Sequence, residues 1–446
     1  MFGCTLGRCL QLTVAGGSYQ EGLHATLQGV PPGMRVAEQG IYGDLLLRKP
    51  GADELSSPRK EPDIPIIYCG VNSADTVEDG GNKGLTNGTP LTILIPNLDR
   101  HFVHINEYQR TNRTPRPGHA SYATFQKYGP ADDAIGAGIF SGRYTCTIVA
   151  AGHVAKSVLA RCGVHVFSYV TELAGVACPE VDHDTARQYC ESYKQMRRDL
   201  DPFYQEMYVR GRMGEEMRLL EKMAVLRDVE QEIDPIRERA PRMEPEQVRE
   251  RYGVHEVLNC PDITAAQAMV DECNRISATG DSAGGLVQVV ALGLPAGLGE
   301  PVFDKLDAEL GRMTGIGAVK AVEIGAGMAV KDMTGSQCND EMRAEDGEVE
   351  FLSNNAGGIT GGITTGQPVI VRLAVKPTPT IDMEQRTIDK YTLENTKLAA
   401  ITRRDPTIVA RIWPVAEAYT ALVLLDHLTM HYGYEELKQR VGGASE

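Results

Sequence analysis

The sequence from residue 357 to residue 372 reads Gly357-Gly-Ile-Thr-Gly-Gly-Ile-Thr-Thr-Gly-Gln-Pro-Val-Ile-Val-Arg372, and Lys376-Pro-Thr-Pro-Thr380 follows it closely. Paired glycines let backbone amides approach a ligand, and a lysine on a proline-stiffened turn brings a cation to the same place. This combination suits a phosphate group. Glycine runs also form tight turns that hold no ligand, so the composition of this stretch leaves both interpretations open.

Five further motifs accompany this stretch. They are Arg116-Pro-Gly-His-Ala120, Gly280-Asp-Ser-Ala-Gly-Gly285, Pro295-Ala-Gly-Leu-Gly-Glu-Pro-Val-Phe-Asp-Lys305, Gly335-Ser-Gln337 and Arg404-Asp-Pro406. Together they resemble the chorismate synthase family, in the family's order. The resemblance implies an α+β fold with long helices sandwiched between antiparallel β-sheets, assembled as a homotetramer. It also implies a 1,4-anti elimination of phosphate from 5-enolpyruvylshikimate 3-phosphate, with reduced FMN as the cofactor.

The composition is that of a globular protein. Of the 446 residues 42% are hydrophobic, enough for a proper core, and we expect one domain over 1–446. The chain shows no run long enough for a membrane span and no signal peptide, so the expected location is the cytoplasm. Ten cysteines without a Cys-x-x-Cys pair indicate reduced thiols. The net charge of −15 argues against nucleic acid or a membrane as a partner, so an anionic substrate needs a local cluster of cations.

Apolar patterning predicts the main elements. Alternation predicts strands at 10–14, 24–29, 65–69 and 91–95. Residues 145–160 carry few charges on any face and predict a buried helix, in which we treat His153 as a packed residue. A last helix is expected at 413–428, with Pro414 in its first turn.

Residues 184–252 are rich in charge and predict a helical insertion, read as a hairpin. One apolar stripe recurs at spacings of three and four along Leu219, Met223, Leu226, Val229 and Ile233. An apolar stripe of this kind is expected to pack against another apolar surface. The insertion is therefore either a solvated appendage or a contact with an oligomer or partner.

The resemblance assigns roles to particular residues, and several motifs depart from the family. His119 matches one of the two catalytic histidines, whereas Tyr19 in Gly16-Gly-Ser-Tyr-Gln20 stands where the other is expected. A phenol has a pKa near 10 and exchanges protons less readily at neutral pH than an imidazole does. We therefore take His119 as the general acid, with Asp405 and Tyr19 completing the catalytic set.

The anion-binding and flavin-binding motifs are also altered. The implied substrate-binding residues are Arg48, Arg143 and Arg404, while Glu54 takes a position where a cation is expected. The implied FMN-binding residues are Ser141, Ala318, Gly362, Lys376, Pro377, Thr378, Pro379, Thr380 and Arg403. Ile139 and Phe140 replace an arginine and a serine, and Gly317 replaces an asparagine.

Two functional hypotheses follow. The first is an FMN-dependent lyase that acts on 5-enolpyruvylshikimate 3-phosphate or, because of the substitutions, on a similar cyclic anion. The second is a non-catalytic family member that serves as a structural or regulatory subunit. We expect no Rossmann site, because no Gly-x-Gly-x-x-Gly motif opens a helix, and no metal site, because His427 and His431 have no third ligand nearby.

Overall fold

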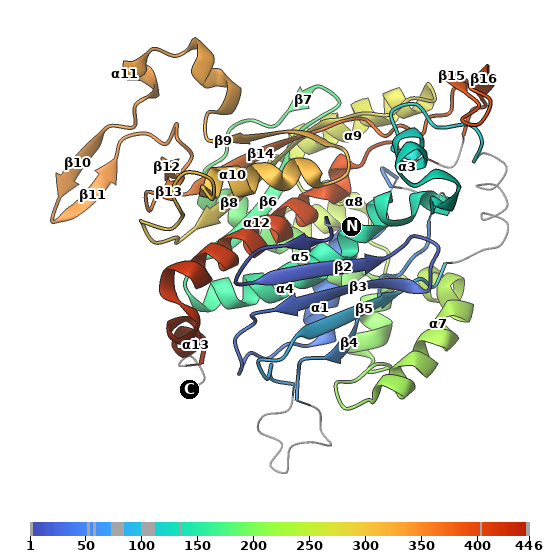
Figure 1. Cartoon of the computed structure of the whole chain (residues 1–446), viewed down its shortest axis with the longest axis horizontal. Coiled ribbons are helices and arrows are strands. Elements are labelled where there is room, and N and C mark those ends of the chain that lie inside the picture. Colours follow the sequence, from blue (N-terminus) through green and yellow to red (C-terminus); the bar gives the residue numbers. More distant parts are fainter. Residues whose placement is uncertain are drawn as a thin grey trace.

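The computed structural model describes residues 3–50, 54–56, 59–72, 84–99, 112–133, 135–401 and 404–442. Within them, two five-stranded antiparallel sheets enclose a layer of helices (Figure 1). The first sheet has the order β1 (Thr5–Leu6), β2 (Gln11–Gly16), β3 (Gly22–Gln28), β5 (Leu91–Pro96) and β4 (Ile66–Cys69). The second has the order β7 (Val176–Ala177), β6 (His165–Leu173), β8 (Gly285–Leu292), β14 (Val369–Val375) and β9 (Val319–Ile324).

Three helices fill the space between the sheets: α1 (Glu38–Arg48), α4 (Thr145–Arg161) and α12 (Val409–Tyr432). Helix α4 is the buried helix that the sequence predicts. It packs so closely on α12 that a Cβ added at Gly152 would lie 2.3 Å from the Cβ of Ala418. The predicted strands also form, and the sandwich confirms the expected α+β fold.

The prediction for the last helix is wrong in two respects. Helix α12 begins at Val409, so Pro414 lies inside it rather than in its first turn, and a further helix, α13 (Tyr434–Gly442), follows. A proline lacks the N–H that would bond the carbonyl four residues earlier, here that of Ala410. The indole N–H of Trp413 donates to this carbonyl instead, at 3.1 Å. The buried helix can therefore pass through the proline with that acceptor satisfied.

The predicted insertion contains more helices than the predicted hairpin. They are α5 (His183–Leu200), the single turn α6 (Pro202–Tyr204), α7 (Leu219–Glu238) and α8 (Pro245–Tyr252). The predicted stripe on α7 is largely correct: Leu226, Val229 and Ile233 are buried, whereas Met223 is 41% exposed. Because α7 lies beside the first sheet (Figure 1), the rest of the same chain covers the stripe. The stripe by itself needs no partner.

A buried ion pair fastens the insertion to α1. The amine of Lys49 pairs with the carboxylate of Asp201, donates to the hydroxyl of Tyr42 at 3.0 Å, and lies 4.8 Å from the ring centre of Phe203. A second pair joins Lys222 to Glu38 at 2.6 Å. The side chains in both pairs are almost fully buried.

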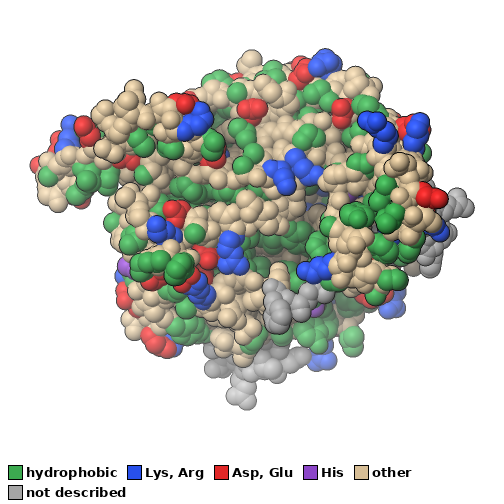
Figure 2. Space-filling model, turned by 45° about the horizontal axis from the view of Figure 1, so that its top comes forward, with side chains coloured by type: hydrophobic (Ala, Val, Ile, Leu, Met, Phe, Trp, Pro, Cys, Tyr) green, Lys and Arg blue, Asp and Glu red, His purple; other side chains and the backbone are tan. Residues whose placement is uncertain are grey.

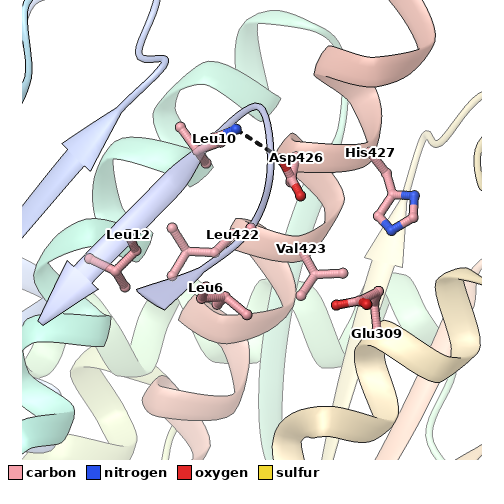
Figure 3. A pocket seen from close by; sticks show the side chains of 9 residues that line it. Leu6, Leu10, Leu12, Glu309, Leu422, Val423, Asp426 and His427 are labelled. Carbon is pink, nitrogen blue, oxygen red and sulfur yellow. Dashed lines mark hydrogen bonds between the residues drawn. The ribbon is translucent and has the colours of Figure 1, made fainter. Parts of the chain in front are cut away.

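The N-terminal loop is fixed to α12 by one carboxylate. Asp426 accepts hydrogen bonds from the backbone N–H groups of Arg8, Cys9 and Leu10, at 2.7–3.1 Å, and Figure 3 shows it pointing toward Leu10. His427 and Glu309 lie at the other side of the same small pocket.

The remaining elements lie outside the two large sheets and the helices between them. The helices are α3 (Ser121–Tyr128), α9 (Ile263–Ala278), α10 (Leu306–Gly311) and α11 (Gly335–Cys338), and the two-stranded sheets are β10–β11 (Met342–Glu345 and Glu348–Phe351), β12–β13 (Ile359–Thr360 and Ile363–Thr364) and β15–β16 (Gln385–Ile388 and Asn395–Leu398). The arm formed by α11, β10 and β11 projects from the body (Figure 1). Among the described residues, no helix combines the length and the apolar character needed to cross a lipid bilayer.

Candidate functional site

The loop of residues 376–380 lies directly on the segment that carries His119. The amine of Lys376 donates to the carbonyl of Gly118 at 2.5 Å, and the guanidinium of Arg116 donates to the hydroxyl of Thr380 at 3.2 Å. A Cβ added at Gly118 would lie 3.5 Å from the Cβ of Pro379. The fold thus brings together two motifs that are far apart in the chain.

His119 is held in its neutral form in this structure. Burial lowers its pKa to about 3, and the cations Arg116 and Lys376 add to the effect. The Nδ1 atom accepts the backbone N–H of Ser121 at 3.1 Å, and a nitrogen of Arg116 lies 3.0 Å from Nε2. A bound anion would offset the two cations and so raise this pKa, whereas the larger effect, that of burial, would remain.

Asp405 supports the 376–380 loop through its backbone. Its carbonyl accepts the hydroxyl of Thr378 at 2.7 Å, and the carbonyl of Thr378 accepts the hydroxyl of Ser282 at 2.8 Å. The carboxylate of Asp405 pairs with Arg411 at 2.6 Å. Sequence reasoning missed Arg411, whose buried Nε atom has no hydrogen-bond partner among the described groups.

Arg48 and Arg143 lie side by side, and both are buried. Arg48 donates to the carbonyl of Arg143 at 3.1 Å, and both guanidinium groups pair with the carboxylate of Asp63. Arg143 also lies 3.3 Å from Glu61 and donates to the side-chain oxygen of Asn97 at 2.9 Å. Two carboxylates thus offset the two predicted substrate-binding cations, and burial lowers the pKa of Arg48.

Sequence reasoning missed Glu61, Asp63 and Asn97. A signal was present, since Glu61-Pro-Asp63 places two acids directly before an apolar strand. Acids in that position are expected to be buried only with a partner.

Tyr19 packs on the segment of residues 135–140. A Cβ added at Gly136 would lie 2.4 Å from the ring of Tyr19, so the phenol covers this glycine. Gly136, Ala137 and Gly138 all have positive φ angles, a conformation that costs energy at Ala137. Ser141 accepts the backbone N–H of Arg143 at 3.3 Å and so caps the next turn.

Ala318 and Gly362 have different surroundings. Ala318 has a φ of 77°, and its carbonyl accepts the backbone N–H of Lys376 at 2.9 Å, which places it beside the loop. Gly362 instead lies against Lys305, whose side chain a Cβ at residue 362 would meet at 2.4 Å. Gly357 and Gly358 likewise meet backbone atoms of Gly325 and Pro368. For these three glycines the turn and packing interpretation explains the contacts that the structure shows.

Arg404 and Glu54, two positions at which the sequence departs from the family motifs, contact residues at the C-terminal end of α9. Arg404 donates to the carbonyls of Ser277 and Asp281, at 2.6 and 2.8 Å, and so satisfies acceptors at the helix C-terminus. Glu54 is exposed and accepts from the side chain of Asn274 at 3.1 Å. Arg403 lies outside the described residues.

The residues around the 376–380 loop fit a phosphorylated ligand. Lys376, Arg116 and Arg411 bring three cations to connected segments, and Lys320 is near enough to Lys376 to lower its pKa further, in addition to the effect of burial. The unpartnered Nε of Arg411 requires an acceptor. A ligand that carries a phosphate would supply such atoms.

Comparisons with known proteins agree with this arrangement. The family model described as chorismate synthase matches residues 10–429. A chorismate synthase of Acetivibrio thermocellus is 36% identical, over 99% of this chain and 98% of that protein, and one of Methanococcoides burtonii is 35% identical, over 96% of each. A solved structure described as the crystal structure of chorismate synthase has the same fold, with a TM-score of 0.63 and 24% identity over 98% of this chain and 97% of that one. The chain therefore belongs to the chorismate synthase family.

Proposed function

We propose that this protein eliminates phosphate from 5-enolpyruvylshikimate 3-phosphate, or from a closely similar cyclic anion, as an FMN-dependent lyase of the shikimate pathway. The observation that carries the proposal is the contact between the His119 segment and the 376–380 loop, with Asp405 behind the loop. It brings a titratable ring and a cationic loop together, and the backbone of Asp405, whose carboxylate pairs with Arg411, holds the loop.

His119 is the proposed general acid. Burial is the larger cause of its depressed pKa, and two neighbouring cations add to the effect. A phosphorylated substrate neutralises those cations, and the ring can then bind and deliver a proton. Tyr19 covers Gly136 and is proposed to line the site as a weak hydrogen-bond donor rather than as a proton shuttle.

FMN is the proposed cofactor. Ser141, Ala318 and the loop residues Lys376, Pro377, Thr378, Pro379 and Thr380 are proposed to hold it, with the amine of Lys376 toward its phosphate. The family's elimination requires a reduced flavin although it involves no net oxidation or reduction, and bound reduced FMN would meet this requirement. The chain's own residues bind and orient the flavin and keep the 116–119 segment in place.

Substrate binding is proposed to be weaker than is usual for the family. Arg48 and Arg143 already share Asp63, and Arg404 is engaged by two carbonyls. A dianionic substrate must compete with these protein groups for the cations. We therefore expect turnover at least about a hundredfold below the level usual for the family, which lies within the range of rate loss caused by a misplaced proton donor.

An anaerobic assay with reduced FMN and 5-enolpyruvylshikimate 3-phosphate tests the function, with reactions lacking FMN as the control. Formation of chorismate that depends on reduced FMN and disappears in Asp405→Asn supports the proposal. Failure to bind FMN in either redox state, together with no turnover, would overturn it.

We further propose that the protein is a homotetramer in the cytoplasm. Figure 2 shows hydrophobic side chains exposed on the projecting arm. Within the arm Met342 is 63% exposed and Val349 is 65% exposed, and such residues support the assembly. Phe303, in the sequence motif of residues 295–305, is 89% exposed. Side chains of this kind are candidates for contact with another subunit. Sedimentation velocity tests the proposal, and a monomer at all concentrations would contradict it.

A further inference from the structure

Tyr144 connects two parts of the candidate site through one hydroxyl group. Its oxygen donates to the carbonyl of Gly315 at 3.2 Å and accepts the backbone N–H of Gly317 at 3.2 Å. Tyr144 directly follows the buried Arg143, whereas Gly315 and Gly317 precede β9. The hydroxyl therefore joins the arginine segment to a loop from a distant part of the chain.

The loop of residues 315–318, which the hydroxyl of Tyr144 holds, is hydrogen-bonded to Lys376. Ala318 follows Gly317, and its carbonyl accepts the backbone N–H of Lys376 at 2.9 Å. The amine of Lys376 in turn donates to Gly118, next to His119. A continuous series of bonds thus runs from the Arg143 segment through residues 315–318 to Lys376 and His119.

This loop has few other means of holding its shape. Gly315 and Gly317 are exposed, and a Cβ added at either would meet no atom within 4 Å. Glycines without side-chain contacts have wide backbone freedom. The anchors are the buried side chain of Ile316, the bonds from the backbone N–H of Ile316 to the carbonyl of Met313 at 2.9 Å and from that of Val319 to the carbonyl of Ile316 at 3.1 Å, and the hydroxyl of Tyr144. The conformation at Ala318, with its positive φ, depends on these anchors.

We infer that Tyr144 is a positioning residue: its hydroxyl sets the 315–318 loop, and through it the backbone of Lys376, for binding of the flavin phosphate. The inference rests on the proposed function only for the identity of the ligand. Tyr144 does not need to touch the flavin, because it acts through Ala318 and Lys376.

The chain offers a matched control for this hydroxyl. The hydroxyl of Tyr189 also joins a backbone N–H and a backbone carbonyl, those of His255 at 2.9 Å and Leu258 at 3.5 Å. Burial raises the pKa of both tyrosines, so both hydroxyls remain protonated at neutral pH. Tyr189 lies on α5 in the insertion and has no part in the series of bonds to Lys376.

Hydrogen–deuterium exchange tests the connection without any ligand. In Tyr144→Phe we expect faster exchange of residues 313–320 and 374–380, with the rest of the chain unchanged. Tyr189→Phe should instead affect the region around 255–258. Equal exchange of residues 313–320 and 374–380 in wild type and Tyr144→Phe would overturn the inference, whatever the protein binds.

Flavin binding tests the consequence. We expect Tyr144→Phe to raise the Kd for FMN about five- to tenfold, because the loss of one hydrogen bond leaves the loop less well ordered before the flavin binds. Tyr189→Phe should leave this Kd unchanged even if it lowers the melting temperature equally. Faster exchange in Tyr144→Phe with an unchanged Kd for FMN would also overturn the positioning role.

A second substitution provides a rescue. Gly317 does not have a positive φ, and an alanine side chain fits there without contact. Alanine narrows the conformations open to the loop, so Gly317→Ala in the Tyr144→Phe background should restore part of the affinity for FMN. If wild type binds no flavin at all, the proposed function fails, and the exchange experiment still decides whether Tyr144 holds the loop.

Discussion

The amine of Lys376 donates to the carbonyl of Gly118 at 2.5 Å, so the loop after β14 holds the residue next to His119. Lys376 is also one of the two cations that depress the pKa of His119. Replacing Lys376 with methionine removes one positive charge and should raise this pKa from about 3 toward the ordinary value of 6.5. Titration of the histidine ring by NMR measures the shift.

Lys320→Met serves as the control, because this exposed lysine is near Lys376 and is not among the groups that depress the pKa of His119. An unchanged His119 pKa in Lys376→Met would show that Lys376 does not contribute and that burial and Arg116 set it.

The neutral His119 also predicts how stability depends on pH. Its pKa is about 3 in the folded state and near 6.5 in the unfolded state, so the unfolded chain binds a proton first as the pH falls. The contribution of this ring to stability is complete above pH 6.5 and is lost progressively from there down to about pH 3. His119→Gln cannot titrate and should lose less stability than wild type between pH 6.5 and 4.

Chemical denaturation at several pH values in that window measures the difference. His183, His255 and His427 also have lowered pKa values, so His119→Gln should keep part of the acid sensitivity. Parallel curves for wild type and variant would contradict the assigned pKa.

The buried pair of Lys49 and Asp201 should matter more for stability than a surface pair in the same insertion. Lys49→Met leaves the carboxylate of Asp201 buried without its cation, which typically costs about 3–5 kcal/mol. The exposed pair of Lys60 and Asp234 is screened by solvent, so Lys60→Met should have little measurable effect. Equilibrium unfolding in urea compares the two variants.

The double variant Lys49→Met with Asp201→Asn should lose less stability than the sum of the single changes, because no charge is then left unpaired. Additive losses would mean that the two groups do not interact in solution.

Tyr19 and Glu54 should respond differently to substitution. Tyr19→His places a group that titrates near neutrality against Gly136 and should raise turnover of 5-enolpyruvylshikimate 3-phosphate about tenfold or more. Glu54→Arg should change the affinity for this substrate by less than about twofold, because Glu54 is exposed and faces Asn274. Steady-state assays and calorimetry test the pair. A larger gain from Glu54→Arg would place Glu54 nearer the substrate than its contact with α9 indicates.

Patterns within single segments predicted much of the fold. The small number of charges on any face of 145–160 predicted a buried helix, because a helix surrounded by protein is mostly apolar all round. The spacing of Leu226, Val229 and Ile233 likewise predicted the buried face of α7. Pro414 led to a wrong prediction of where the last helix begins. The helix continues through this proline because the indole N–H of Trp413 bonds the carbonyl of Ala410, and residue propensities contain no information on that contact.

The sequence by itself determined the family, the sandwich of helices and antiparallel sheets, and the choice of His119, Asp405 and residues 376–380 as the candidate site. The family follows from residue identity in the motifs, and the sandwich and the candidate site are what the resemblance to that family implies. Only the tertiary structure decided which charges are already paired: that Asp63 holds Arg48 and Arg143, that Arg404 caps α9, and that Lys49 faces the insertion. The reason is physical, since the partner of a buried charge is chosen by what the fold brings within a few ångströms, and such partners are distant in the chain.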